Sequence, residues 1–152
     1  MSEVFNLLDG ELDGAEERPG YRHRRRMVGR LLGADQLGAT VYEVPPGEKL
    51  WPYHWELGCE EFLVVVAGRP TVRTPEGERE LASGDVVNFP EGESGAHQVI
   101  NRSGSVCRVL IGSTKSSVAV AGYPDSGKLL VWGRGREQVV VREEPVDYWD
   151  GE

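Results

Sequence analysis

The segment HWELGCEEFLVVVAG, residues 54–68, places a group of polar side chains directly before the longest apolar run of the chain. Side chains of an extended strand alternate between two faces, so His54 and Glu56 point to the same side of their strand. The run 62–67 is rich in valine and ends at Gly68, which is typical of a buried strand followed by a turn. The segment therefore predicts two strands joined by a short turn.

Glu61 begins the second of these strands and has the same parity as Leu63 and Val65. As part of a hairpin, this strand can return the Glu61 carboxylate to the side on which the first polar pair lies. Glu60 has the opposite parity, and we expect it in solvent. Cys59 lies in the turn, where we expect a free thiol rather than a ligand.

Short segments with strand composition continue along the chain, and glycine or proline separates them. The 20 glycines among 152 residues are about twice the usual share of roughly 7%. No segment between residues 37 and 113 has the pattern of an amphipathic helix. Short strands at this spacing predict an all-β sandwich or barrel. The expected strands are 40–44, 61–67, 71–74, 79–81, 86–89, 97–100, 106–112, 116–121 and 128–132.

The bulk composition is that of a single globular domain. The chain has 152 residues, of which 39% are hydrophobic, and a net charge of −8. This charge disfavours nucleic acid and anionic membranes as partners. The longest apolar run is far shorter than the roughly 18 residues of a membrane span. Because the two cysteines form no CxxC pair and no secretory segment is evident at the start, we expect a cytoplasmic protein.

A second histidine follows the loop 91–95 and begins another expected strand, at His97. In a small barrel this side chain can face the same interior as His54 and Glu61, so that three strands would surround one site. Two histidines with one or two carboxylates suit a divalent transition metal, and two histidines with one carboxylate are associated with non-haem Fe(II). Zinc, manganese and nickel remain open, because affinity order alone does not select the metal.

These residues resemble the two sequence motifs of the cupin superfamily. The first motif has a glycine, then H-x-H, a glutamate after three or four residues and a glycine after six more. It is matched by His54-Trp55-Glu56, Glu61 and Gly68. The second motif, G-x5-P-x-G-x2-H-x3-N, is matched by Gly84, Pro90, Gly92, His97 and Asn101. The resemblance is to small single-domain bacterial cupins and covers roughly residues 37–113. It implies a double-stranded β-helix, the cupin jelly roll, with N- and C-terminal extensions.

Carried over position by position, the resemblance implies a divalent metal cofactor held by His54, Glu56, Glu61 and His97. Glu56 stands where the family usually has its second histidine. Two loop spacings also differ: Gly47 lies one residue further from the motif histidine, and four residues rather than two precede His97. An extra carboxylate hardens the site and favours Fe(II) or Mn(II) without excluding Zn(II). Alternatively, Glu56 acts as an acid or base beside the metal, or the barrel is a metal-free pocket.

Members of this superfamily include dioxygenases, isomerases, decarboxylases and sugar-binding modules, so the fold alone does not select a reaction. The resemblance implies a metal-dependent enzyme, dioxygenase-like or isomerase-like, that acts on a small organic molecule. The alternative is a small-molecule or sugar-binding sensor without turnover, because no further acid, base or nucleophile is evident beyond the ligand set. Since cupins are often dimers, we also expect a homodimer.

The flanking residues complete three expected regions: an N-terminal arm and edge strand (1–36), the barrel (37–113) and a C-terminal extension that packs on it (114–152). Residues 1–20 are rich in acidic residues and glycine, which predicts a mobile arm. The run RHRRR, residues 22–26, predicts a charge-paired edge strand with His23 at the surface. A nucleic-acid patch is the alternative that the acidic neighbourhood disfavours.

Overall fold

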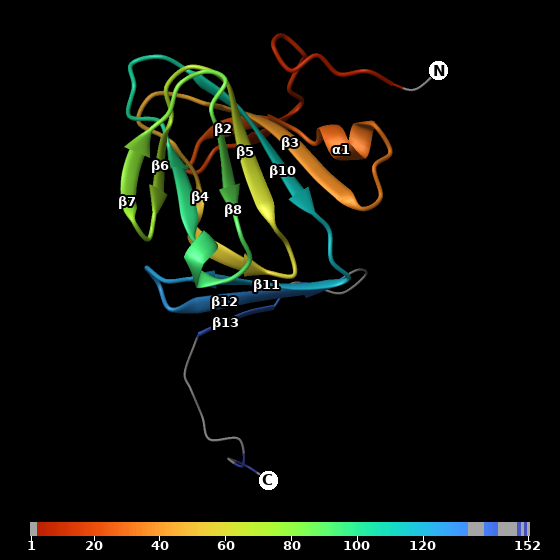
Figure 1. Ribbon diagram of the computed structural model, residues 1–152, viewed down its shortest axis with the longest axis vertical. Coiled ribbons are helices and arrows are strands. Elements are labelled where there is room, and N and C mark those ends of the chain that lie inside the picture. Colours follow the sequence, from red (N-terminus) through yellow and green to blue (C-terminus); the bar gives the residue numbers. More distant parts are fainter. Residues whose placement is uncertain (1–2, 134–138, 143–148, 150, 152) are drawn as a thin grey trace.

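Two antiparallel β-sheets face each other and enclose the core (Figure 1). The computed structural model describes residues 3–133, 139–142, 149 and 151. The first sheet has the order β1-β2-β3-β10-β5-β8, and the second β13-β12-β11-β4-β9-β6-β7. The elements are β1 (Gly14–Glu16), β2 (His23–Arg26), α1 (Val28–Leu31), β3 (Leu37–Val44), β4 (Lys49–Leu57), β5 (Glu61–Ala67), β6 (Thr71–Thr74), β7 (Gly77–Glu80), β8 (Val86–Phe89), η1 (Glu93–Gly95), β9 (His97–Ile100), β10 (Cys107–Thr114), β11 (Val118–Tyr123), β12 (Lys128–Gly133) and β13 (Val139–Arg142).

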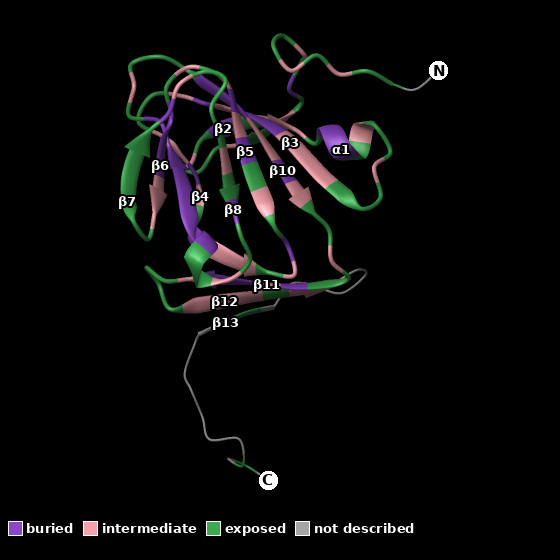
Figure 2. Ribbon diagram, viewed as in Figure 1, coloured by how far each residue is buried: buried purple, intermediate pink, exposed green. Residues whose placement is uncertain are grey.

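The core lies between the two sheets, where the inward faces of the strands bury their apolar side chains. On β5, Leu63 and Val65 point into the core and are buried, while Phe62 is exposed on the opposite face. This is the alternation that a strand predicts. Figure 2 shows buried residues along β9, whereas the edge strand β7 is exposed throughout. The main core cluster contains Tyr42, Val44, Leu50, Leu63, Val65, Val72, Leu81, Phe89, Val99 and Val109.

The predicted all-β architecture of short strands is confirmed, and the strands form two antiparallel sheets. Strands β5, β6, β8 and β9 have the bounds expected from the sequence. Strand β3 begins at Leu37 rather than at residue 40, because its pairing with β10 extends to Leu37↔Thr114. Among the described residues, no helix has the length and apolar character that crossing a membrane requires.

The N-terminal arm packs against the first sheet, so the expectation of a mobile arm is wrong. Leu12 is 3% exposed and lies in a second apolar cluster with Val28 and Val41. Phe5 packs against the same cluster. Burial of these side chains stabilises the arm on the sheet, an effect that its acidic composition does not reveal.

Arg108 on β10 attaches the arm to the first sheet through hydrogen bonds. Its guanidinium donates hydrogen bonds to the carbonyl oxygens of Leu7 (2.7 Å) and Gly10 (2.6 Å) and to Glu43 Oε1 (2.6 Å). Arg108 is 7% exposed. The buried guanidinium therefore has three oxygen partners, and it supplies hydrogen-bond donors to two backbone carbonyl oxygens of the arm.

His23 is also placed differently from the expectation, because it is 2% exposed rather than at the surface. Alternation on β2 turns His23 inward while Arg24 points to solvent. The His23 ring lies edge-on to the rings of Tyr42 (5.4 Å between centroids) and Trp51 (4.9 Å). Its Nδ1 donates to the Tyr21 carbonyl at 2.9 Å, and among the described residues its Nε2 has no hydrogen-bond partner.

Acid is expected to destabilise the protein in part through His23. Burial lowers the pKa of His23 below its ordinary 6.5; the Tyr21 carbonyl opposes this shift, Arg25 adds to it and Glu16 opposes it. The unfolded chain therefore binds a proton at a higher pH than the folded chain does. The stability that neutral His23 contributes is present above the unfolded pKa and is lost as pH falls through the folded pKa.

Urea unfolding at several pH values measures this effect. Between pH 6.5 and about pH 5, we expect the free energy of unfolding to fall less in His23→Phe than in the unchanged protein. Phenylalanine keeps a ring against Tyr42 and Trp51 but does not titrate, so the difference between the two pH dependences reports the proton on His23. Equal slopes in the two proteins would contradict the assignment.

The hairpin β11–β12, together with β13, lies across one end of the barrel (Figure 1). β11 joins the barrel by pairing with β4, through Val120↔Leu57, Ala121↔Glu56 and Gly122↔Trp55. The C-terminal extension expected from the sequence, 114–152, thus includes three strands. Its residues 134–138, 143–148, 150 and 152 lie outside the described residues.

Candidate metal centre

Three of the four predicted ligands come together at the end of the barrel that carries β11. His54 on β4 and His97 on β9 are direct partners in the strand pairing, and Glu61 is the first residue of β5. One ligand atom from each lies within 4.8 Å of the other two. Glu61 Oε2 is 3.3 Å from His97 Nε2. The barrel therefore collects two imidazoles and one carboxylate from three strands.

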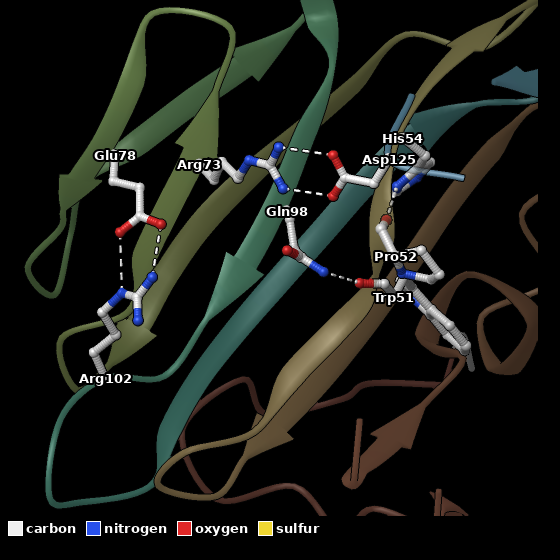
Figure 3. A network of polar contacts seen from close by, with 8 residues as sticks. All are labelled: Trp51, Pro52, His54, Arg73, Glu78, Gln98, Arg102 and Asp125. Carbon is white, nitrogen blue, oxygen red and sulfur yellow. Dashed lines mark hydrogen bonds and ion pairs between the residues drawn. The ribbon is translucent and has the colours of Figure 1, made fainter. Parts of the chain in front are cut away.

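Both imidazoles are oriented by backbone carbonyl groups. His54 Nδ1 lies 2.8 Å from the Pro52 carbonyl oxygen (Figure 3), and His97 Nδ1 lies 2.9 Å from that of Gly95. A carbonyl oxygen only accepts, so Nδ1 of each ring donates and Nε2 is the nitrogen left to face the site. This arrangement is the one that metal-binding histidines use. Two such nitrogens and a carboxylate fit a divalent transition metal.

Glu56 lies beside this group of three but is not part of it. Its Oε1 is 3.9 Å from His54 Nε2, and the cluster found among the described residues contains only His54, Glu61 and His97. Burial raises the pKa of Glu56 to about 7, the Glu61 carboxylate adds to the shift, and a hydrogen bond with Cys59 opposes it. A bound cation would lower this pKa. Ligation by Glu56 stays a prediction.

The other polar residues of the opening segment take the places that parity predicted. Glu60 is exposed, and its Oε1 accepts a hydrogen bond from Asn88 Nδ2 at 3.0 Å. Cys59 is a free thiol next to Glu56. Burial raises the pKa of the Cys59 thiol, and the Glu56 carboxylate adds to that shift. The cluster found among the described residues does not include Cys59.

A pocket of about 350 Å³ opens beside the two carboxylates. Its lining includes Glu56 and Glu61 from the barrel, Thr114 at the end of β10, Lys115 and Ser116 after it, and Trp132 on β12. A larger hollow of about 480 Å³ lies next to Arg25, Arg26 and Arg30. Its lining contains none of the candidate ligands, whereas that of the smaller pocket contains Glu56 and Glu61.

Tyr123 belongs to the site although the sequence did not single it out. Its ring stacks on that of His54, with 5.9 Å between centroids and an angle of 25° between planes. Burial raises the pKa of Tyr123, and the Glu56 carboxylate adds to this shift. The segment from Tyr123 to Gly127 reads as a turn with Pro124 and Gly127. Nothing in that pattern shows that the ring returns to the barrel.

The turn that follows Tyr123 is attached to the second sheet by an ion pair (Figure 3). Arg73 on β6 donates two hydrogen bonds to the Asp125 carboxylate, at 2.6 and 2.9 Å. The same guanidinium lies over the ring of Tyr53, 3.9 Å from its centroid. Bidentate pairs of this kind fix geometry as well as contributing attraction.

Asn101, the last residue of the second motif, has a structural role. Its amide nitrogen donates to the carbonyl oxygens of Val44 and Ser105, both at 2.7 Å. Its Oδ1 accepts hydrogen bonds from the backbone N–H of Ser103 (2.9 Å) and from the Ser103 hydroxyl (2.7 Å). Asn101 is fully buried, so it fixes the turn before β10 rather than contacting a ligand.

Comparison with known proteins agrees with this fold. The family model described as the cupin domain matches residues 40–112, which contain all four predicted ligands. Residues 40–112 form a cupin domain. Among the curated proteins, no sequence matches this cupin significantly.

Solved structures similar to this cupin include enzymes of two kinds. A protein of Acidithiobacillus ferrooxidans to which sugar phosphate isomerase activity is attributed is 26% identical, with a TM-score of 0.75; the match covers 81% of this chain and 78% of that one. A cupin sugar phosphate isomerase of Silicibacter pomeroyi is 22% identical, with a TM-score of 0.82 and coverage of 96% and 98%, and shares the fold. A polyketide cyclase of Streptomyces resistomycificus is 26% identical, with a TM-score of 0.60 and coverage of 75% and 80%.

Proposed function

We propose that this cupin is a metal-dependent enzyme of the isomerase type, which moves a proton between adjacent carbons of a small hydroxycarbonyl compound. The observation that carries the proposal is the second carboxylate. Glu56 lies next to the His54, Glu61 and His97 group, outside that group and on the lining of the pocket. A carboxylate in this position can exchange a proton with a substrate.

In this reaction the residues divide into two sets. His54, Glu61 and His97 would hold a divalent cation, which supplies Lewis acidity toward a carbonyl or hydroxyl oxygen when bound. The Glu56 carboxylate takes a proton from the carbon next to the carbonyl and returns it to the neighbouring carbon. The C–H electron pair moves toward the carbonyl, and a hydroxyl proton moves to the other oxygen. Atoms and charge balance without an oxidant.

A basic residue in the lining of the pocket supports an anionic substrate. Lys115 stands in this lining with the hydroxyl groups of Thr114 and Ser116. Its Nζ donates a hydrogen bond to the Ala34 carbonyl oxygen at 2.9 Å and keeps two further N–H donors. Glu56 and Glu61 belong to the same lining. A ligand with a reactive carbonyl at one end and a phosphate or carboxylate at the other matches this distribution of charge. The sugar phosphate activity attributed to the 26% identical structural neighbour supports the same class.

Deuterium exchange tests the proposal without knowledge of the product. Purified protein supplied with Mn(II) or Zn(II) is incubated in D₂O with a panel of aldose and ketose phosphates, and NMR detects deuterium at the carbon next to the carbonyl. We expect exchange with at least one compound. In Glu56→Gln the exchange rate should fall by about 100-fold or more, while the cation still binds.

Glu61→Gln is the matched control, since it changes the neighbouring carboxylate of the same pocket. We expect it to weaken cation binding as well as exchange, because Glu61 belongs to the group of three. If Glu56→Gln weakens cation binding as much as Glu61→Gln does, Glu56 is a ligand and not the base. Ligand binding without exchange would indicate a binding module, and oxygen consumption would indicate a dioxygenase; either result contradicts the proposal.

A further inference from the structure

We propose that Gln98 is a positioning residue for His54, which it holds indirectly through the backbone of an irregular segment of β4. His54 is a candidate ligand of the metal centre on which the proposed function rests. Gln98 is absent from that centre: it follows His97 on β9, and adjacent strand residues point to opposite faces. Gln98 is 6% exposed.

Strand β4 bulges directly before His54. Leu50 pairs with Val99, and His54 pairs with His97. Between these two pairs the chain advances by four residues on β4 but by only two on β9. The extra residues of β4 therefore lie outside the regular pairing. Within this segment Trp51 has φ 44°, the one positive value found at a non-glycine residue of the described chain. Such a conformation is disfavoured for a bulky residue and persists where its surroundings fix it.

Gln98 supplies the contact that fixes this bulge. Its Nε2 donates a hydrogen bond of 2.7 Å to the Trp51 carbonyl oxygen. Figure 3 shows the amide of Gln98 pointing at that oxygen, with Pro52 and His54 next along the strand. Pro52 has no N–H to leave unpaired, and proline inside a sheet is usual at bulges. The side chain thus replaces the ladder hydrogen bond that the bulge has lost.

The bulge in turn sets the imidazole of His54. The Pro52 carbonyl oxygen, one residue after Trp51, accepts the hydrogen bond from His54 Nδ1 at 2.8 Å. If the Trp51 carbonyl loses Gln98, the bulge can relax, the Pro52 carbonyl turns with it, and His54 loses the partner that keeps its Nε2 unprotonated. His97 does not depend on this path, because its Nδ1 is bonded to the Gly95 carbonyl.

This difference between the two histidines gives a test inside one molecule. Gln98→Met keeps the length of the side chain and removes the donor. In the metal-free protein, long-range ¹H–¹⁵N spectra report which imidazole nitrogen carries the proton. We expect Nδ1 of both histidines to carry a proton in the unchanged protein. In Gln98→Met we expect a mixture of forms for His54 and no change for His97.

Cation binding is the second readout. We expect Gln98→Met to weaken the affinity for Mn(II) and Zn(II) by roughly 10-fold to 100-fold, the usual effect of removing a group that orients a ligand. Arg102→Met is the matched control. It breaks an exposed ion pair with Glu78 near the end of the same strand and should leave both the spectra and the affinity unchanged.

The outcomes separate this proposal from the proposed function. An unchanged His54 spectrum in Gln98→Met overturns the role of Gln98, whatever the protein binds. Absence of cation binding in the unchanged protein overturns the proposed function, while the spectra still decide the role of Gln98. If Gln98→Met does not fold, exchange of the Gln98 side-chain amide in the unchanged protein decides: slow exchange of one Nε2 proton supports the proposal, and fast exchange of both contradicts it.

Discussion

The double variant His54→Ala, His97→Ala is expected to lose cation binding and the exchange activity together. These two residues provide both imidazole nitrogens of the three-residue group. The remaining carboxylates, Glu61 and Glu56, offer a site without the nitrogen donors that retain transition metals. Elemental analysis after purification without chelator should find about one metal ion per chain in the unchanged protein and none in the double variant.

Thermal or urea unfolding provides an independent measurement. A cation at about 100 times its dissociation constant should add about 2.7 kcal/mol to the free energy of unfolding of the unchanged protein. The double variant should gain nothing. The chain has three histidines, so His23→Phe is the matched control and should keep the full effect. Equal metal content in the unchanged protein and the double variant would show that the cluster does not bind a metal.

Arg108→Met is expected to lower the free energy of unfolding by about 3 to 5 kcal/mol, as is usual when one partner of a buried ion pair is removed. Three oxygen atoms lose their donor at once: Glu43 Oε1 and the carbonyl oxygens of Leu7 and Gly10. Methionine preserves the apolar part of the side chain, so the loss reflects the hydrogen bonds. Urea unfolding measures it.

The control for this prediction is again Arg102→Met. Its ion pair with Glu78 has side chains 56% and 41% exposed, and exposed pairs contribute about 0 to 1 kcal/mol. Because Arg108 holds the arm, limited proteolysis should also cleave within residues 3–12 faster in Arg108→Met. Equal stability of the two variants would show that other contacts of the arm, such as the cluster around Leu12, hold it without Arg108.

The barrel and the convergence of three candidate ligands could be predicted because they depend on local rules. Side-chain alternation determined that Glu61 rather than Glu60 faces the interior, and β5 has the alternation required. Strand pairing then placed His97 opposite His54. The same rules could not decide whether Glu56 ligates, because its carboxylate lies at the margin of the group.

The features that the sequence did not reveal depend on contacts between distant residues. The arm is held by Arg108, which lies 101 positions after Leu7. His23 stands in a run of arginines, and only the pairing of β2 with β3 shows that it faces the core. Tyr123 reaches His54 through the hairpin at the end of the barrel. The sequence does not indicate the left-handed backbone conformation of Trp51, because glycine is the residue expected at such a φ.

The ion pair between Arg73 and Asp125 makes the surroundings of the Tyr123 ring sensitive to ionic strength. Asp125 attaches the turn after Tyr123 to β6, and the Tyr123 ring stacks on that of His54. The two charged side chains are 35% and 55% exposed, and salt screens such pairs. Added salt should therefore weaken the attachment of this turn, so the packing beside His54 depends on the solution as well as on the fold.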